Sequence, residues 1–135
     1  MRNKDSFRAS ISIKGLHLLM EKISKIEGVK AIYLYGSHAR GKTHTLSDID
    51  ICVIGLENNE YLEKELLGYI KDNIDISYFW RLPLAIRFRV FKEGIPLVIY
   101  DKHYINKLKI YTLNNYLDFL PLINRFCIER FGCTI

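Results

Sequence analysis

Two aspartates, Asp48 and Asp50, lie two positions apart in the alternating stretch 48–54. Successive side chains of a strand point to opposite faces of its sheet, so both carboxylates leave the same face. Two carboxylates at this spacing repel each other unless a cation lies between them. Mg²⁺ typically combines a few carboxylates with the phosphates of a substrate. The pair therefore predicts a metal site that handles a phosphorylated ligand.

The segment before this pair carries groups that suit a phosphate. Gly36 follows the apolar run 29–35 and precedes a predicted helical turn. A glycine there permits close approach of a ligand, and free N–H groups at a helix start favour an anion. Ser37 adds a hydroxyl donor and Arg40 a cationic donor, and ten residues separate Ser37 from Asp48. A phosphate cradle beside two carboxylates predicts a metal-bound nucleotide.

Hydrophobic periodicity predicts the elements that position these groups. The order is helix, strand, turn, strand, helix, strand and then mostly helix, which is an α/β (α+β) fold. Pro96 places the last strand at an edge of the sheet, because proline cannot donate to a central ladder. The predicted strands cover 29–35, 48–54, 74–79 and 95–100, and the predicted helices cover 13–26, 59–71, 84–91 after Pro83, and 102 to the C-terminus with an interruption near Pro121.

Composition predicts one ordinary globular domain. The chain has 135 residues, of which 49% are hydrophobic and 26% charged, values that exclude a disordered chain. The longest apolar runs fall far short of the roughly 20 residues that span a bilayer. The charged N-terminus lacks the apolar region of a secretory signal. Cys52, Cys127 and Cys133 form no CxxC pair, so we expect reduced thiols in a cytoplasmic protein.

Charge is segregated along the chain. Residues 1–45 carry nine Lys/Arg against three Asp/Glu, residues 46–75 two against eight, and residues 76–135 nine against four. The net charges are therefore +6, −6 and +5. An acidic middle between basic segments fits a carboxylate metal site that faces a polyanionic ligand, although solvated helix faces give the same counts.

Gly36-Ser37, ten residues and Asp48-x-Asp50 together resemble the signature of the DNA polymerase beta nucleotidyltransferase superfamily. The fuller string GSxARG…SDIDI looks most like the smallest members, the minimal nucleotidyltransferase (MNT) proteins, which serve as antitoxins of HEPN-domain toxins. The resemblance extends from about residue 29 to about residue 130. It implies a small mixed β-sheet with helices packed on it, the nucleotidyltransferase fold. Residues 1–135 would then be a single nucleotidyltransferase domain with a C-terminal helical extension at about 102–135.

The resemblance also implies roles for the carboxylates. The superfamily needs a third carboxylate on a neighbouring strand, and Asp75 matches it, with Asp72 in the preceding turn as a rival. Asp48 and Asp50 would bind two Mg²⁺ ions, and Asp75 would bind the catalytic ion and take the proton of the nucleophile.

The nucleotide-binding residues implied by the same motif are Gly36, Ser37, Arg40 and Ser47. The implied reaction is transfer of AMP from ATP to a protein hydroxyl, a tyrosine of a cognate HEPN toxin. The chain would then be the antitoxin of a type VII pair, with no membrane and no direct nucleic-acid contact. Two alternatives stay open: a nucleotidyltransferase that acts on a small molecule or a nucleic-acid end, and a non-catalytic antitoxin that binds its toxin.

Other chemically capable residues have structural interpretations. We expect Cys52 to be a small core residue, and Trp80 with the pair 78–79 to be core or partner surface rather than a base-stacking site. Arg87 and Arg89 either reach the triphosphate or face solvent. One face of the basic, aromatic region 102–131, or of the helix after Pro83, should remain exposed and dock a partner.

Overall fold

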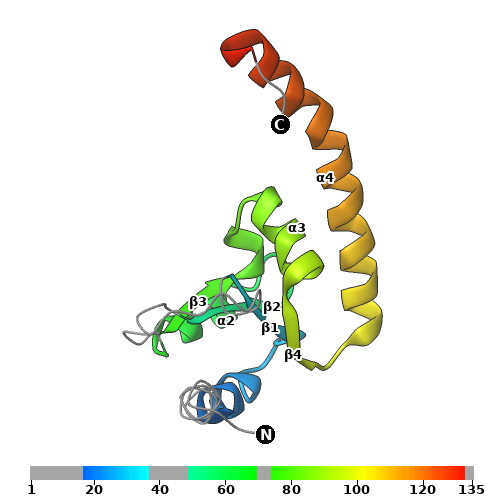
Figure 1. Ribbon diagram of the computed structural model, residues 1–135. Coiled ribbons are helices and arrows are strands. Elements are labelled where there is room, and N and C mark those ends of the chain that lie inside the picture. Colours follow the sequence, from blue (N-terminus) through cyan, green and yellow to red (C-terminus); the bar gives the residue numbers. More distant parts are fainter. Residues whose placement is uncertain (1–16, 37–48, 70–73, 133–135) are drawn as a thin grey trace, which may run out of the picture.

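A mixed sheet forms the centre of the computed structural model, which describes residues 17–36, 49–69 and 74–132 (Figure 1). Within this part the sheet has the order β3-β2-β1-β4. β1 pairs antiparallel with β2 and β4, whereas β2 and β3 are parallel. The prediction of a small mixed sheet is confirmed, and the strand that contains Pro96 is an edge strand, as predicted. The strands are β1 (Ala31–Tyr35), β2 (Ile49–Ile54), β3 (Ile74–Tyr78) and β4 (Ile95–Ile99).

Helices precede, separate and follow the strands along the chain. Residues 17–24 are helical, and the later elements are α2 (Glu60–Leu67), the 3-10 turn η1 (Phe79–Arg81), α3 (Leu84–Glu93) and α4 (Lys102–Phe131). The side chain of Asn59 caps α2 by accepting a hydrogen bond from the Leu62 N–H at 3.1 Å. α2 ends before Gly68, earlier than the predicted residue 71, because the Gly68 and Tyr69 amides turn back onto carbonyls of the last helical turn.

The predicted interruption of the last helix near Pro121 is wrong, because α4 continues through this residue to Phe131. A proline inside a helix removes one backbone hydrogen bond and crowds the preceding turn, which commonly bends a helix without ending it. Figure 1 shows the axis of α4 curving toward its C-terminal end. Gly132, in the left-handed conformation, ends the helix instead.

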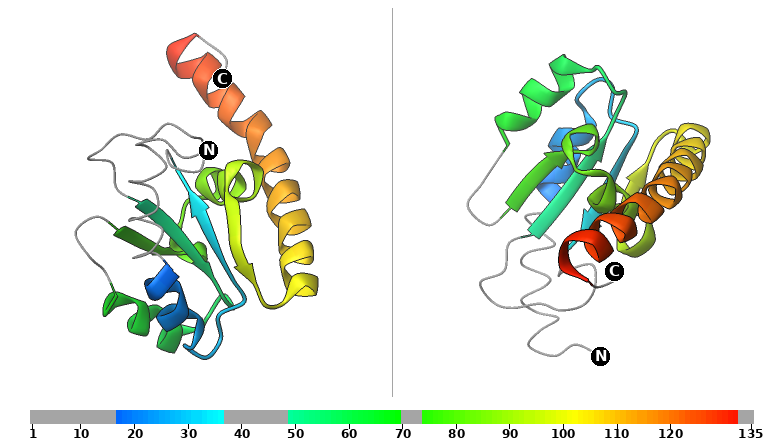
Figure 2. Two further views of the ribbon diagram at one scale, coloured as in Figure 1. Left: turned by 60° about the horizontal axis from the view of Figure 1, so that its bottom comes forward. Right: turned by 90° about the horizontal axis from the view of Figure 1, so that it is seen from above.

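Different helices cover the two faces of the sheet (Figure 2). One face packs on the helix over residues 17–24 and on α2, and the other packs on η1, α3 and α4. Cys52 is fully buried in the second core, which confirms its prediction as a small core residue. The first core includes Leu19, Ile23, Ile32, Ile51, Val53, Leu62 and Leu66, and the second includes Ala31, Tyr33, Ile54, Phe79, Val90, Ile105 and Leu108.

Phe79 is the centre of an aromatic cluster between the sheet and α3. Its ring lies 5.4 Å from Trp80 and 5.3 Å from Phe91, measured between ring centroids. The Trp80 indole N–H donates to the Gly55 carbonyl at 3.0 Å. These contacts confirm that the aromatic residues after β3 belong to the core.

The two arginines of α3 differ in their surroundings. The Arg87 guanidinium lies 5.5 Å from the Trp80 ring centroid, and its Nε donates to the Leu82 carbonyl at 2.9 Å. Arg87 is thus half-buried against aromatic rings, whereas Arg89 on the same helix is exposed. Among the described helices, none combines the length and the apolar character that crossing a membrane requires.

Replacing Phe79 by alanine should destabilise the protein by about 3–5 kcal/mol, because the fully buried ring leaves a cavity in the aromatic cluster. Urea unfolding followed by circular dichroism measures this change. Tyr61→Ala is the control: that side chain is 60% exposed on α2, so its loss should change the free energy of unfolding by less than about 0.5 kcal/mol. Equal effects of the two substitutions would contradict the assigned core.

Candidate functional site

Two of the three predicted catalytic carboxylates meet on neighbouring strands. In the parallel ladder of β2 and β3, Asp50 is the register partner of Asp75. Register partners point to the same face of a sheet, so both carboxylates leave the face that also bears Cys52 and Ser77. Asp50 is half-buried and Asp75 is exposed. The register thus places these two carboxylates side by side on one face of the sheet.

The end of β1 closes the site on the other side of Asp50. Tyr35 is the register partner of Asp50, and Gly36 follows it with φ +79°. A Cβ atom on Gly36 would overlap Oδ2 of Asp50 and lie 3.2 Å from its Cγ. Both the backbone conformation and this close approach require glycine. Gly36 was predicted to leave room for a ligand; what the structure shows is that it leaves room for the Asp50 carboxylate.

Tyr35 is a site residue that the sequence analysis missed. Its hydroxyl donates to Ser77 Oγ at 3.4 Å, which links the end of β1 to β3. Burial is the main cause that raises the pKa of Tyr35, and the charges of Asp50 and Asp75 raise it further. The phenol therefore stays protonated near neutral pH and remains a hydrogen-bond donor. Strand alternation alone did not reveal it, because only the β1–β2 register places it beside Asp50.

Several predicted site residues lie outside the described residues. These are Asp48, which precedes β2, the rival carboxylate Asp72, and the predicted nucleotide ligands Ser37, Arg40 and Ser47. Within residues 17–36, 49–69 and 74–132, no group of three acidic, histidine or cysteine side chains could hold a metal ion. The described part contributes two carboxylates, and carboxylate oxygens are the donors that Mg²⁺ prefers. This donor set fits a magnesium site completed by further ligands.

Comparison with known proteins identifies a family and several relatives of this chain. Residues 18–103 match the family model described as polymerase beta, nucleotidyltransferase. A Methanocaldococcus jannaschii protein, named as a candidate protein adenylyltransferase, is 43% identical over 71 residues, which cover 53% of this chain and 54% of the relative. The chain thus spans about half the length of the curated relative it matches.

Solved structures share the fold. A chain from a toxin–antitoxin crystal structure with AMP-PNP is 23% identical, with a TM-score of 0.62, and the match covers 85% of this chain and 97% of that one. A chain from the complex of tri-AMPylated HEPN toxin with MNT antitoxin of Shewanella oneidensis is 19% identical, with a TM-score of 0.58, and the match covers 92% and 98%. At these identities the likeness shows the fold alone.

The matched range contains all four strands, the Asp50–Asp75 pair and Gly36. The family model thus covers well over half of the chain, including the end of the sheet where the carboxylates meet. Fold, register and family model agree, and the chain belongs to the polymerase beta nucleotidyltransferase family.

Proposed function

We propose that this chain is a Mg²⁺-dependent nucleotidyltransferase that moves AMP from ATP onto a hydroxyl group of another protein. The observation that supports this most directly is the in-register pair of Asp50 and Asp75 beside Gly36. The family supports nucleotidyl transfer, and the name of the Methanocaldococcus jannaschii relative supports a protein acceptor.

Each predicted residue has a role in this proposal. Asp48, Asp50 and Asp75 hold the magnesium ions, two of which are expected. When bound, the metal neutralises charge on the phosphates and aligns the attacking and leaving oxygens. Gly36 and Ser37 hold the triphosphate, assisted by Arg40 and Ser47.

The reaction balances as a single displacement. The acceptor oxygen forms a bond to the α-phosphorus of ATP, the bond from that phosphorus to the oxygen that bridges to the β-phosphorus breaks, and pyrophosphate leaves. The acceptor proton passes to the carboxylate of Asp75, which is exposed and so accessible to an incoming protein. A tyrosine hydroxyl with a pKa near 10 needs such a base at neutral pH.

The acceptor in this proposal is a tyrosine of a cognate HEPN toxin, and the chain is the antitoxin of a type VII pair that acts in the cytoplasm. Structural neighbours with this fold come from toxin–antitoxin crystals, one of them with an AMPylated HEPN toxin.

A surface for the partner is provided by α4. Ile105, Leu108 and Thr112 are buried, whereas the later turns expose many apolar side chains. An apolar surface of this kind marks an interaction site. We define the α4 apolar surface as the exposed residues Phe119, Leu122 and Phe126, which the 3.6-residue period of the helix places on one side, whereas Ile110, Leu113, Leu117 and Ile128 lie on the opposite side.

Asp50→Asn and Asp75→Asn should each reduce AMP transfer by at least about 100-fold, because each removes one negative charge that holds the metal. Neither substitution should lower the melting temperature in metal-free buffer, since each relieves repulsion between neighbouring carboxylates. The assay uses labelled ATP, Mg²⁺ and a purified HEPN-domain protein as the acceptor, followed by mass spectrometry. Glu93→Gln, on α3, is the matched charge control. A fall in melting temperature that accounts for the lost transfer would assign the aspartates a structural role.

Gly36→Val should weaken binding of ATP–Mg²⁺ by more than it destabilises the fold. The branched side chain would displace the Asp50 carboxylate and fill the space beside the phosphates. Calorimetric titration with the non-hydrolysable analogue AMP-PNP and Mg²⁺ measures the affinity, and urea unfolding measures the stability. Gly68→Val is the control, because the nearest atom to its Cβ lies 3.5 Å away and its φ is negative. Unchanged affinity in a folded Gly36→Val protein would contradict the phosphate cradle.

Leu122→Asp and Phe126→Asp should abolish capture of the toxin, since a charge in the centre of an apolar interface is costly to bury. Charge reversal at the exposed lysines Lys102, Lys107 and Lys109 should slow association and make it less sensitive to salt. Pull-down and surface plasmon resonance at two salt concentrations measure both effects. Leu18→Asp, at an exposed position on the helix over residues 17–24, should bind as the parent does. Normal capture by all α4 variants would place the partner on another surface.

A further inference from the structure

Among the described residues, β3 and β4 are the two edge strands of the sheet. Within the described residues no strand pairs with the outer side of β3. All five residues of β3 carry a backbone N–H, whereas the opposite edge strand, β4, contains Pro96, which has none. Free edge N–H and C=O groups are spaced to pair with an extended polypeptide. β3 is therefore the edge better suited to accept an additional strand.

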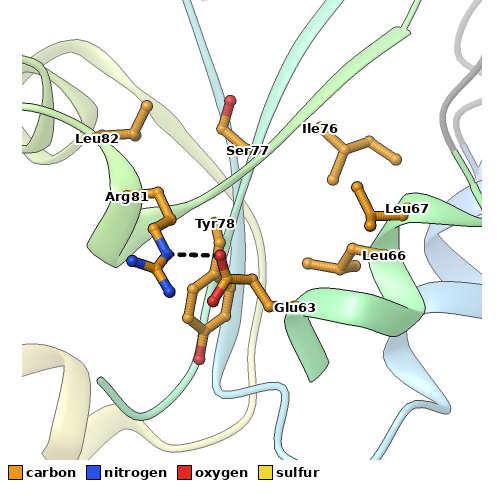
Figure 3. A pocket seen from close by; sticks show the side chains of 8 residues that line it. All are labelled: Glu63, Leu66, Leu67, Ile76, Ser77, Tyr78, Arg81 and Leu82. Carbon is orange, nitrogen blue, oxygen red and sulfur yellow. Dashed lines mark hydrogen bonds and ion pairs between the residues drawn. The ribbon is translucent and has the colours of Figure 1, made fainter. Parts of the chain in front are cut away.

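A groove runs beside this edge, between α2 and the turn after β3 (Figure 3). It has a volume of about 270 Å³. Its two charged side chains neutralise each other, because Arg81 Nε lies 2.6 Å from Glu63 Oε2. The rest of the lining is mainly apolar, so the groove suits an uncharged side chain. The lining residues are Glu63, Leu66, Leu67, Ile76, Ser77, Tyr78, Arg81 and Leu82.

Strand alternation connects the groove to the candidate site. Ile76 points toward Leu66 and Leu67, whereas the neighbouring Ser77 points away from them (Figure 3). Asp75 and Ser77 lie on the same face of β3, two residues apart. Their register partners in β2 are Asp50 and Cys52, on the face that packs on the second core. The side chains of a strand added to β3 would therefore alternate between the groove and the carboxylates.

We propose that the β3 edge binds an extended segment of the acceptor protein by strand addition. Its hydroxyl-bearing residue lies on the Asp75 face, and an apolar residue one position away fills the groove beside Leu67. Backbone hydrogen bonds supply the binding, and the two alternating positions supply the selectivity. This inference rests on the proposed transfer to a protein hydroxyl, and it adds the conformation and the local pattern of the acceptor.

The test uses the full chain and a synthetic peptide, acetyl-Lys-Thr-Val-Tyr-Val-Thr-Lys-amide. Two further copies carry N-methyl groups, one on both valines and the other on the tyrosine and the second threonine. Successive amides of a strand point to opposite edges and every second amide to the same edge, so only one of the two copies blocks pairing with β3. NMR titration should shift the amides of residues 74–78. One methylated copy should bind at least about fivefold more weakly than the parent peptide, and the other within about twofold.

Substitutions of Leu67 test the groove. Leu67 is 67% exposed, so Leu67→Lys and Leu67→Glu should fold normally. Both should weaken peptide binding, since either charge disrupts the apolar lining. If charge alone acted on the basic peptide, Leu67→Lys would weaken binding and Leu67→Glu would strengthen it. Leu18→Lys and Leu18→Glu are the matched controls, because Leu18 is 59% exposed on another helix.

Three results would overturn strand addition at β3: shifts centred on residues 95–99, equal effects of the two methylated copies, or unchanged binding by both Leu67 variants. Transfer of labelled AMP to the same peptide is measured separately. Peptide binding without transfer to peptide or toxin would count against the proposed function and not against the edge. Transfer to the toxin without peptide binding at residues 74–78 would count against the edge alone.

Discussion

The in-register parallel pairing of β2 with β3 is the constraint on which the candidate site depends. It places Asp50 opposite Asp75, on one face and at the same level of the sheet. Because side chains alternate along a strand, a slip of one residue would move Asp75 to the opposite face, among the apolar side chains of the first core. The apolar residues of β3 oppose such a slip, since Ile74, Ile76 and Tyr78 would all leave the first core together. The register that buries these side chains also brings the carboxylates together.

The backbone at the end of β1 lies close to the carboxylate of Asp50. Gly36 lies against the Asp50 carboxylate in a conformation that other residues rarely adopt. Tyr35, immediately before it, donates across the sheet to Ser77. The end of β1 therefore limits the positions of both carboxylate-bearing strands. These contacts hold the Asp50 carboxylate in place before a cation binds, which would reduce the reorganisation that binding requires.

Packing also explains why two different surfaces of this small domain stay exposed. The first turns of α4 bury Ile105 and Leu108 against the sheet, and the later turns extend beyond it with exposed apolar side chains (Figure 1). A long helix can thus anchor at one end and bind a partner at the other. The β3 edge lies beside Asp75 and suits only an extended segment. We infer that affinity comes mainly from α4 and that selection of the modified residue comes from β3.

The sequence by itself predicted the order of the described helices and strands, the edge position of β4 and the two aspartates, Asp50 and Asp75, that lie side by side in the candidate site. These follow from local rules: alternation predicted β2, Pro96 excluded a central position, and Gly36 with Asp50 carried a short motif. The predicted interruption at Pro121 was wrong. A local rule registers the one backbone hydrogen bond that proline removes, but not the many helical hydrogen bonds that remain on both sides of it.

Only the tertiary structure decided which strands are neighbours and in what register. Tyr35 is 42 residues from Ser77 in the chain, and nothing local connects them. The sequence likewise did not decide whether Arg87 reaches the triphosphate or faces solvent. Its position over the rings of Phe79 and Trp80 depends on how α3 packs on η1. Local patterns report the direction of a side chain from its own backbone. Long-range pairing depends on the combined burial of many side chains, and it alone determines which of those directions converge.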